Sequence, residues 1–315
     1  MKILTNDGIS QHALATLEKA GFEVLNIKVA QEQLENYINE TGVDALLIGS
    51  SIQIQQELID NCPSIKLIGS TQSNSDNIDV QYAEDQGIHV INSSEAGADS
   101  IAELVFAHLL GMVRHLHQSN REMPLEGDSN FRGLKKLYKG NELKGKTLGI
   151  IGMNSVGIAT AKIALGLGMK VIIHDLEVNE ISVEFEFFDG QTTNFQFIST
   201  EINELFKNSD FISVNVLAQD VYLIGENQFD KMKDGVGFIN CTQGGIVDEI
   251  ALVNAIESGK VKYAALDVFE NEPNPEIQLL MNTSLSLSPN IGSATFEAED
   301  KISIELATKV IELLS

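Results

Sequence analysis

The sequence predicts an α/β protein with two doubly wound parallel sheets, one in each of two domains. Strand and helix patterns alternate through residues 1–93, and they alternate again from residue 146 onward. Between these regions, a short apolar strand ends in a glycine turn and leads directly into a helix. Repeated strand–helix units with short connections form parallel sheets that are covered on both faces. The length of 315 residues agrees with two domains.

The first 93 residues have the pattern of a complete small α/β domain. Helical spacing is found between the predicted strands, as in Gln11–Ala20, where Leu14 and Leu17 are expected to face the core, and in Ile78–Gln86. The strands are predicted at Lys2–Thr5, Phe22–Ile27, Val43–Ile48, Lys66–Gly69 and His89–Asn92.

A long apolar helix is predicted after this domain. Apolar residues lie on nearly every side of Ile101–Leu116, so we expect this helix to be buried between domains or between subunits. Residues 120–145 have the composition of a polar loop with several lysines. His115 and His117 are two residues apart and do not share a helix face, so no metal site is predicted.

The stretch Lys146–Gly157 has the order of a dinucleotide-binding unit. An apolar run reaches Gly152, a helical pattern follows the turn, and a second strand, Val171–His174, ends at Asp175. In such units the helix N-terminus faces the pyrophosphate, and an acid about 20 residues further on binds the ribose hydroxyls. The middle glycine of the fingerprint is Asn154 here, and its side chain takes room that the pyrophosphate needs. These residues alone are compatible with a dinucleotide site and with a plain strand–turn–helix connection.

The second domain continues after an inserted segment. Apolar and polar residues alternate on both sides of Asp189 and Gly190, which predicts a β-hairpin that decorates the domain. The last helix is predicted to return to the first domain and to leave a cleft between the two. Further strands are predicted at Phe211–Leu217, Val236–Cys241, Tyr263–Val268 and Leu285–Ser288, and helices at Asn227–Met232, Asp248–Ser258 and Thr295–Leu314.

Composition excludes several classes of partner. A formal net charge of −24 repels nucleic acid and anionic membranes, since phosphate binding needs clustered Lys and Arg. No apolar run approaches the roughly 18 residues that span a membrane. The N-terminus lacks the pattern of a signal peptide.

Cys62 and Cys241 have no metal-ligand spacing, which favours a reducing, cytoplasmic location. Arginine occurs only at Arg114, Arg121 and Arg132, so few groups can hold a small anion bidentately.

Several motifs resemble a known family. Leu143–Gly152, Gly244–Glu249 and Ala265–Pro273 are similar to the D-2-hydroxyacid dehydrogenases. Asp76–Asp79 and Ile101–Glu103 resemble the phosphoglycerate dehydrogenase-like branch of that family. The resemblance covers essentially the whole chain. It implies NAD as cofactor and a 2-hydroxy or 2-oxo acid as substrate.

The resemblance also implies a domain organisation and an oligomer. It implies a flavodoxin-like substrate domain at residues 1–95 and 293–315, an inserted Rossmann NAD-binding domain at residues 96–292, and a homodimer formed through the helix at residues 98–119. Asp175 favours NAD over NADP, because a carboxylate repels a 2′-phosphate.

The resemblance assigns the site residues by position. It assigns catalysis to Glu272, to Gln243 where the family has arginine, and to Asn290 where the family has histidine. Ser73, Asn74 and Gln243 are assigned to the substrate. The residues assigned to the cofactor are Gly152, Asn154, Ser155, Val156, Gly157, Asp175, Val216, Thr242, Asp267 and Gly292.

These substitutions leave three hypotheses about function. The first is an NAD-dependent 2-hydroxyacid dehydrogenase with weak activity or an altered substrate. The second is a catalytically inactive relative that binds a dinucleotide or a small ligand, or serves as a partner subunit. The third is a different chemistry that uses Glu272. Gln243 brings no charge to a substrate carboxylate, and Asn290 cannot accept a proton near neutral pH.

Overall fold

The fold was analysed in a computed structural model, which describes residues 1–49, 51–71, 77–93, 96–218 and 221–315. The chain divides into two compact units. The first unit comprises Met1–Ala98 and Ser293–Ser315, and the second unit comprises Asp99–Gly292. Both are α/β, as the sequence predicts.

The first unit is built on a five-stranded sheet with the order β2-β1-β3-β4-β5, in which all neighbours are parallel. Helices pack on both of its faces, two on one face and three on the other. The strands are β1 (Lys2–Thr5), β2 (Glu23–Leu25), β3 (Ala45–Ile48), β4 (Leu67–Ser70) and β5 (His89–Asn92). The helices are α1 (Gln11–Lys19), α2 (Gln31–Thr41), α3 (Gln56–Asn61), α4 (Val80–Asp85) and α13 (Phe296–Leu314).

Alternation along the strands explains why both faces of this sheet are covered. Neighbouring residues of a strand point to opposite faces. In β3, Leu46 packs into the cluster that contains residues of α2, α3 and α4. Leu47, the next residue, packs with Leu17 of α1 and with Val310 of α13. The strands therefore need helices on both sides, and α13 supplies part of one side from the far end of the sequence.

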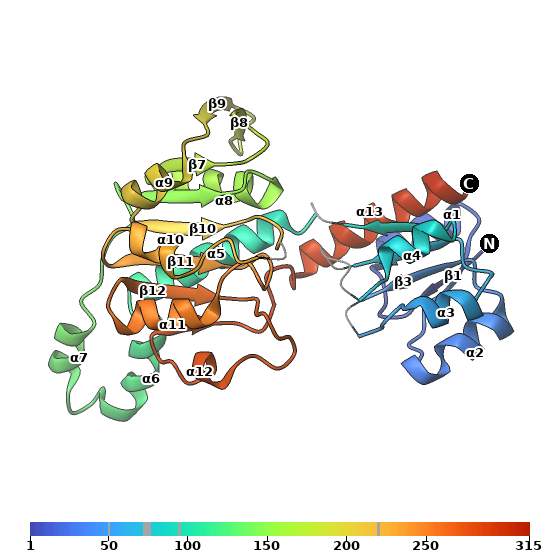
Figure 1. The fold of residues 1–315 in the computed structure, drawn as a ribbon, viewed down its shortest axis with the longest axis horizontal. Coiled ribbons are helices and arrows are strands. Elements are labelled where there is room, and N and C mark those ends of the chain that lie inside the picture. Colours follow the sequence, from blue (N-terminus) through green and yellow to red (C-terminus); the bar gives the residue numbers. More distant parts are fainter. Residues whose placement is uncertain (50, 72–76, 94–95, 219–220) are drawn as a thin grey trace. The chain divides into compact units, whose positions relative to one another are not determined.

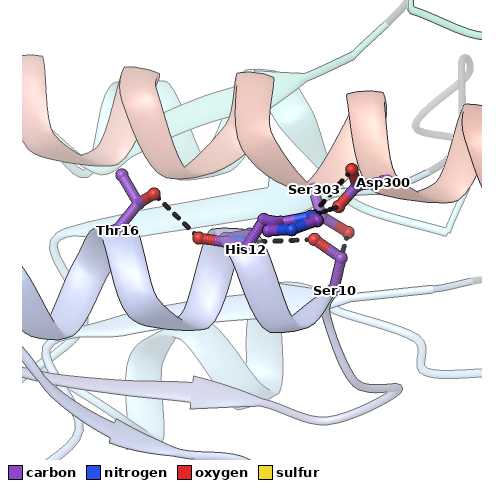
Figure 2. A network of polar contacts seen from close by, with 6 residues as sticks. Ser10, His12, Thr16, Asp300 and Ser303 are labelled. Carbon is purple, nitrogen blue, oxygen red and sulfur yellow. Dashed lines mark hydrogen bonds and ion pairs between the residues drawn. The ribbon is translucent and has the colours of Figure 1, made fainter.

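Polar contacts also join α13 to the start of α1 (Figure 2). The Ser10 N–H donates to Ser303 Oγ at 3.1 Å, and Ser10 Oγ caps α1 by accepting from the N–H of Ala13. His12 Nδ1 lies 3.1 Å from Asp300 Oδ2. His12 is largely exposed, so this pair adds little stability, and the apolar contacts carry the packing.

The second unit is built on a six-stranded parallel sheet with the order β13-β12-β11-β10-β6-β7. Its strands are β6 (Thr147–Ile151), β7 (Lys170–His174), β10 (Phe211–Val214), β11 (Val236–Asn240), β12 (Val261–Leu266) and β13 (Leu285–Leu287). The order reverses between β6 and β10, since β7 lies on one side of β6 and the later strands lie on the other. Such a reversal is where doubly wound sheets bind ligands, beyond the carboxyl ends of the strands.

Helices cover this sheet, and one hairpin stands apart from it (Figure 1). Phe206, Phe229 and Leu252 come from three helices and pack against Phe238 of the central strands. The hairpin predicted around Asp189 and Gly190 is confirmed. It consists of β8 (Glu180–Glu186) and β9 (Thr192–Ile198). The helices are α5 (Ala98–Val113), α6 (Leu116–Glu126), α7 (Phe131–Leu137), α8 (Ser155–Gly166), α9 (Ile202–Asn208), α10 (Glu226–Lys231), α11 (Glu249–Glu257) and α12 (Ile277–Leu280).

Two expectations for residues 98–145 are wrong. The segment 98–119 is not one helix, because α5 ends at Val113 and α6 begins at Leu116. His115, with φ 53°, lies between them in the left-handed region, which an α-helix cannot continue through. Residues 120–145 are not a loop either, since they hold the rest of α6 and all of α7. These helices were not predicted because their composition is polar and they bury little apolar surface. Leu134 is the buried residue of α7.

Candidate functional site

The carboxyl ends of the parallel strands bring the predicted site residues to one edge of the second sheet. Gly152 follows β6, Asp175 follows β7, and Val216 lies just beyond β10. The other predicted residues follow the remaining strands. Thr242 and Gln243 come after β11, Asp267 and Glu272 after β12, and Asn290 and Gly292 after β13.

The glycine turn after β6 requires its two flanking glycines. Gly152 has φ +91°, and a Cβ there would lie 2.7 Å from Val216 Cγ1. A Cβ on Gly157 would lie 2.1 Å from the carbonyl oxygen of Gly152, so α8 could not approach the turn as closely. These are the roles that the first and third glycines of a dinucleotide fingerprint have.

Asn154 replaces the middle glycine and caps α8. Its Oδ1 accepts from the N–H of Gly157 at 3.1 Å, and its Nδ2 donates to the carbonyl oxygen of Asn215 at 2.6 Å. The side chain is thereby held at the helix terminus. Among the described residues, the N–H groups of Ser155 and Val156 in the first turn have no acceptor. The turn thus keeps two donors for a phosphate at a helix N-terminus.

Asp175 is held by three backbone donors. Its Oδ2 accepts from the N–H of Met153 at 2.7 Å, and its Oδ1 accepts from the N–H groups of Glu177 and Val178 at 2.9 and 3.0 Å. Burial tends to raise the pKa of this carboxyl, but the three hydrogen bonds outweigh burial and lower it. The side chain is therefore an ionised carboxylate at neutral pH.

Gln243 and Thr242 are held by residues at and just beyond the end of β10. Gln243 Oε1 accepts from the N–H of Ala218 at 2.8 Å, which leaves its Nε2 as a donor that no described residue engages. Thr242 Oγ1 donates to the carbonyl oxygen of Val214 at 3.0 Å. The amide of Gln243 therefore offers one uncharged N–H donor in this part of the site.

Glu272 and Asn290 form a hydrogen-bonded pair. Asn290 Nδ2 donates to Glu272 Oε2 at 2.7 Å, and Glu272 Oε1 accepts from the N–H of Phe269 at 3.0 Å. Asn290 has φ 53°, a left-handed conformation that asparagine tolerates better than most residues. Both side chains are exposed. The pair consists of one carboxylate and one amide, and the amide takes no part in proton transfer near neutral pH.

Asp267 holds the loop that carries Asn290. Its carboxylate accepts from Ser288 Oγ at 2.5 Å and from the N–H groups of Ile291 and Gly292 at 2.9 and 2.8 Å. The N–H of Asn290 donates to the carbonyl oxygen of Asp267 at 2.7 Å. Asp267 is only 1% exposed. These four bonds fix the backbone on both sides of Asn290.

A buried histidine extends this network, and the sequence analysis missed its role. His108 of α5 contacts Ser288 Oγ through Nε2 and Ser286 Oγ through Nδ1, both at 2.8 Å. Because the hydroxyl proton of Ser288 goes to Asp267, His108 donates from Nε2 and accepts at Nδ1, as a neutral imidazole. Burial lowers the pKa of His108, opposed by the charge of Asp267. The alternation Leu-Ser-Leu-Ser at 285–288 was the signal that two hydroxyls share one strand face.

Glu249 is a second residue that the sequence analysis passed over. It is 6% exposed at the start of α11, and its Oε2 has no hydrogen-bond partner among the described residues. Oε1 accepts from the N–H of Glu270 at 2.9 Å. Burial raises its pKa from 4.5 to about 7; the hydrogen bond from Glu270 opposes the rise, and the charges of Glu270, Glu276 and Glu272 add to it.

A cavity of about 390 Å³ lies beside the Glu272–Asn290 pair. Its walls are mainly apolar, and its polar lining comes from Glu272, Asn290 and Ser288. No lysine or arginine is among its lining residues. Phe269, Pro273, Pro275, Leu280, Leu287 and Pro289 supply the apolar part. The volume is within the range of small-molecule sites.

The residues at the strand ends fit a dinucleotide. The glycine cradle, the two N–H groups at the start of α8 and the ionised Asp175 match a pyrophosphate followed by a ribose. Ser73 and Asn74, which were predicted to contact the substrate, lie outside the described residues. Within the described part of the chain, no group of three or more His, Cys, Asp or Glu could hold a metal ion. No helix of that part is long and apolar enough to cross a membrane.

Known proteins resemble this chain along its whole length. Residues 106–292 match the family model described as D-isomer specific 2-hydroxyacid dehydrogenase, NAD binding domain. Hydroxypyruvate reductase of Thermotoga maritima is 37% identical over 319 residues, which cover 99% of this chain and 98% of that protein. D-3-phosphoglycerate dehydrogenase of Archaeoglobus fulgidus is 34% identical over 321 residues, 99% of this chain but 57% of that relative. The chain thus spans little more than half the length of the latter.

The solved structures agree with the sequence comparisons. The crystal structure of a glyoxylate reductase from Paecilomyes thermophila has a TM-score of 0.77 and 27% sequence identity, and the match covers 99% of this chain and 95% of that one. The crystal structure of the TT0316 protein from Thermus thermophilus has a TM-score of 0.78 and 26% identity, over 98% of this chain and 94% of that one.

Proposed function

Because the chain belongs to the D-isomer specific 2-hydroxyacid dehydrogenase family of NAD-dependent oxidoreductases, we propose that it binds NAD and interconverts a 2-hydroxy acid and its 2-oxo acid slowly. The observation that carries the proposal is the pair formed by Asn290 and Glu272, with Nδ2 and Oε2 2.7 Å apart. An amide stands where the family's histidine is expected, and Glu272 still has a hydrogen-bonding partner there.

The chemistry of the site supports a slow reaction. Reduction of a 2-oxo acid requires a proton at the C2 oxygen, and NAD in its reduced form supplies the hydride. Asn290 can donate a hydrogen bond to that oxygen but cannot deliver a proton. Loss of a general acid or base lowers a rate by roughly 10²–10⁴. Gln243, at the position of the family's arginine, can donate to the substrate carboxylate from Nε2 without charge.

The cavity beside the pair supports a substrate with an uncharged, apolar side chain. Its walls are mainly apolar, and the charge of Glu272 at its edge repels anions. A phosphorylated 2-oxo acid has no lysine or arginine to bind among the lining residues. When the two acids compete for NADH-bound protein, 4-methyl-2-oxopentanoate is expected to bind at least about tenfold more tightly than a phosphorylated 2-oxo acid. Tighter binding of the phosphorylated acid would contradict this assignment.

The central test restores the family's arginine and histidine. Calorimetric titration with NADH comes first, and we expect a micromolar dissociation constant. The double variant Gln243→Arg/Asn290→His is then compared with wild type on a panel of 2-oxo acids, by the loss of NADH absorbance. It should raise kcat/KM by about 100-fold or more, because a cation and a proton donor are both regained. Gln278→Arg/Asn274→His, which adds the same groups at exposed positions of the same unit, is the matched control.

Two results would refute the proposal. Wild-type turnover at rates typical of the family would show that neither arginine nor histidine is needed. Absence of binding at millimolar NADH would show that the cofactor site is lost. In the second case, a catalytically inactive relative that serves as a ligand-binding protein or partner subunit becomes the better interpretation. The uncharged Gln243 and Asn290 favour that candidate.

We also propose a cytoplasmic homodimer, formed through α5 and the helices that follow it. Large apolar side chains are exposed on α6 and α7, among them Leu125 at 73% and Phe131 at 57%. A second copy of the chain would cover them. Sedimentation equilibrium of the wild type should give a dimer, and Leu125→Asp/Phe131→Asp should shift the mass toward the monomer. An unchanged mass in the variant would exclude this surface.

A further inference from the structure

The hairpin β8–β9 begins and ends close to Asp175, the residue predicted to bind the cofactor ribose. The chain leaves Asp175, passes through both strands, and returns beside it at Ser199, where Ile173 and Ser199 form an isolated parallel bridge. The sequence analysis treated this segment as decoration. Its two ends instead supply most of the hydrogen bonds that Asp175 makes.

Ser199 holds the backbone of Asp175 from the exit of the hairpin. The N–H of Asp175 donates to Ser199 Oγ at 3.0 Å, and Ser199 Oγ donates to the carbonyl oxygen of Asp175 at 3.1 Å. The N–H of Ser199 donates to the carbonyl oxygen of Asn179 at 2.9 Å, which closes the base of the hairpin. The next residue, Thr200, donates to the carbonyl oxygen of Ile173 from both its N–H and its hydroxyl.

The entry of the hairpin holds the carboxylate of the same residue. The N–H groups of Glu177 and Val178 occupy Oδ1, and the N–H of Met153 occupies one site on Oδ2. A carboxylate has about four acceptor sites, so the described residues leave one on Oδ2 for a ribose hydroxyl. Turning the side chain away would break three hydrogen bonds at once.

The hairpin itself is anchored, so its ends are not free to move with Asp175. Val183 of β8 is 2% exposed, and β8 contacts α8, the helix that follows the glycine turn. Residues 175–206 contain no lysine or arginine. A 2′-phosphate placed here would therefore meet a fixed carboxylate and no cation from this segment.

We propose that Ser199 is a positioning residue which, with the hairpin β8–β9, holds Asp175 in one orientation and thereby makes the chain reject a 2′-phosphorylated dinucleotide. The proposal rests on the NAD site described above. A carboxylate at this position repels a 2′-phosphate by its charge, but a mobile carboxylate could turn aside. Here discrimination depends also on hydrogen bonds from residues that never touch the cofactor.

The test compares the affinities of NADH and NADPH for three full-length variants, by calorimetry. Ser199→Ala removes both hydrogen bonds to the backbone of Asp175 and should lower the NADH preference by about tenfold, chiefly through tighter NADPH binding. Ser199→Thr keeps the hydroxyl and should restore the preference. Ser182→Ala is the matched control, because Ser182 lies in the same hairpin and bonds Gln196 instead.

Amide hydrogen exchange gives a second readout that needs no cofactor. In Ser199→Ala, but not in Ser182→Ala, the N–H groups of Met153, Glu177 and Val178 should exchange faster, since their acceptor has become mobile. The same measurement shows whether the variant is folded.

The outcomes separate this proposal from the one on which it rests. An unchanged NADH to NADPH ratio in Ser199→Ala, together with normal NADH binding, overturns the role of Ser199 alone. Unchanged exchange at the three amides overturns it as well. Wild-type protein that binds neither dinucleotide overturns the cofactor site itself.

Discussion

The buried carboxyl of Glu249 predicts that the stability of the second unit depends on pH. Its Oε2 has no partner among the described residues, and its Oε1 is held by the N–H of Glu270. Glutamine at this position would keep the shape and the Oε1 contact. Its amide would imitate the protonated carboxyl at every pH, so Glu249→Gln should abolish the titration without creating a cavity.

The magnitude follows from the pKa. Burial and the neighbouring acids raise the pKa of Glu249 from 4.5 to about 7 in the folded state. The folded state thus binds a proton more tightly than the unfolded state, and this contribution to stability is present in full below pH 4.5 and lost as the pH rises through 7. A shift of this size corresponds to roughly 3 kcal/mol of unfolding free energy.

Urea unfolding at pH 5, 6, 7 and 8 measures this difference. Wild type should lose most of those roughly 3 kcal/mol relative to Glu249→Gln between pH 5 and pH 8. The variant should be the more stable protein at pH 8. Glu257→Gln, on an exposed position of the same helix, should follow the wild-type pH dependence. If Glu249→Gln keeps the wild-type slope, the carboxyl is already ionised in the folded protein at pH 5, and burial does not raise its pKa.

Three further predictions concern individual residues. Asn154→Ala should destabilise the protein by about 1 kcal/mol, since it removes the cap of α8, whereas Asn154→Gly should cost only a few tenths of a kcal/mol. Equal losses of stability in urea unfolding would show that Asn154 does not act as a cap. Gly244→Ala should lower the free energy of unfolding by about 1–3 kcal/mol, because the new Cβ would lie 1.9 Å from the carbonyl oxygen of Phe269. Wild-type stability of the variant would show that this loop can move to make room for the Cβ. Cys62 and Cys241 should resist a thiol reagent at pH 8 until the protein unfolds. Burial raises the pKa of Cys62 to about 11 and the pKa of Cys241 well above its ordinary range. Rapid labelling of the native protein would refute this prediction.

The sequence predicted the elements that follow hydrophobic periodicity. β1 and β5 were predicted to the residue, and the hairpin was located from its alternation around Asp189 and Gly190. Residues 98–145 were not predicted correctly, because no periodicity shows that His115 adopts a left-handed conformation. Composition likewise cannot distinguish a polar helix with little buried surface from a loop.

The residues of the candidate site could be named from the sequence, but their contacts could not. The family resemblance named Gly152, Asp175 and Asn290 as site residues, and the structure places all three after strands of one parallel sheet. What each side chain bonds was not predictable. His108 is 178 residues from Ser286, and Ser199 is 24 residues from Asp175, so these contacts depend on packing that no local pattern encodes.

The return of α13 to the first unit has a consequence for synthesis on the ribosome. Ala307 and Val310 cover a face of the first sheet with Ile3, Leu17 and Leu47, and this face stays open until the last helix has emerged. The second unit, residues 99–292, is complete before that point. Domains usually finish folding in the order in which they are made. Here the unit that is begun first is finished last, and its open apolar face is exposed to chaperones and proteases while the second unit is still being made.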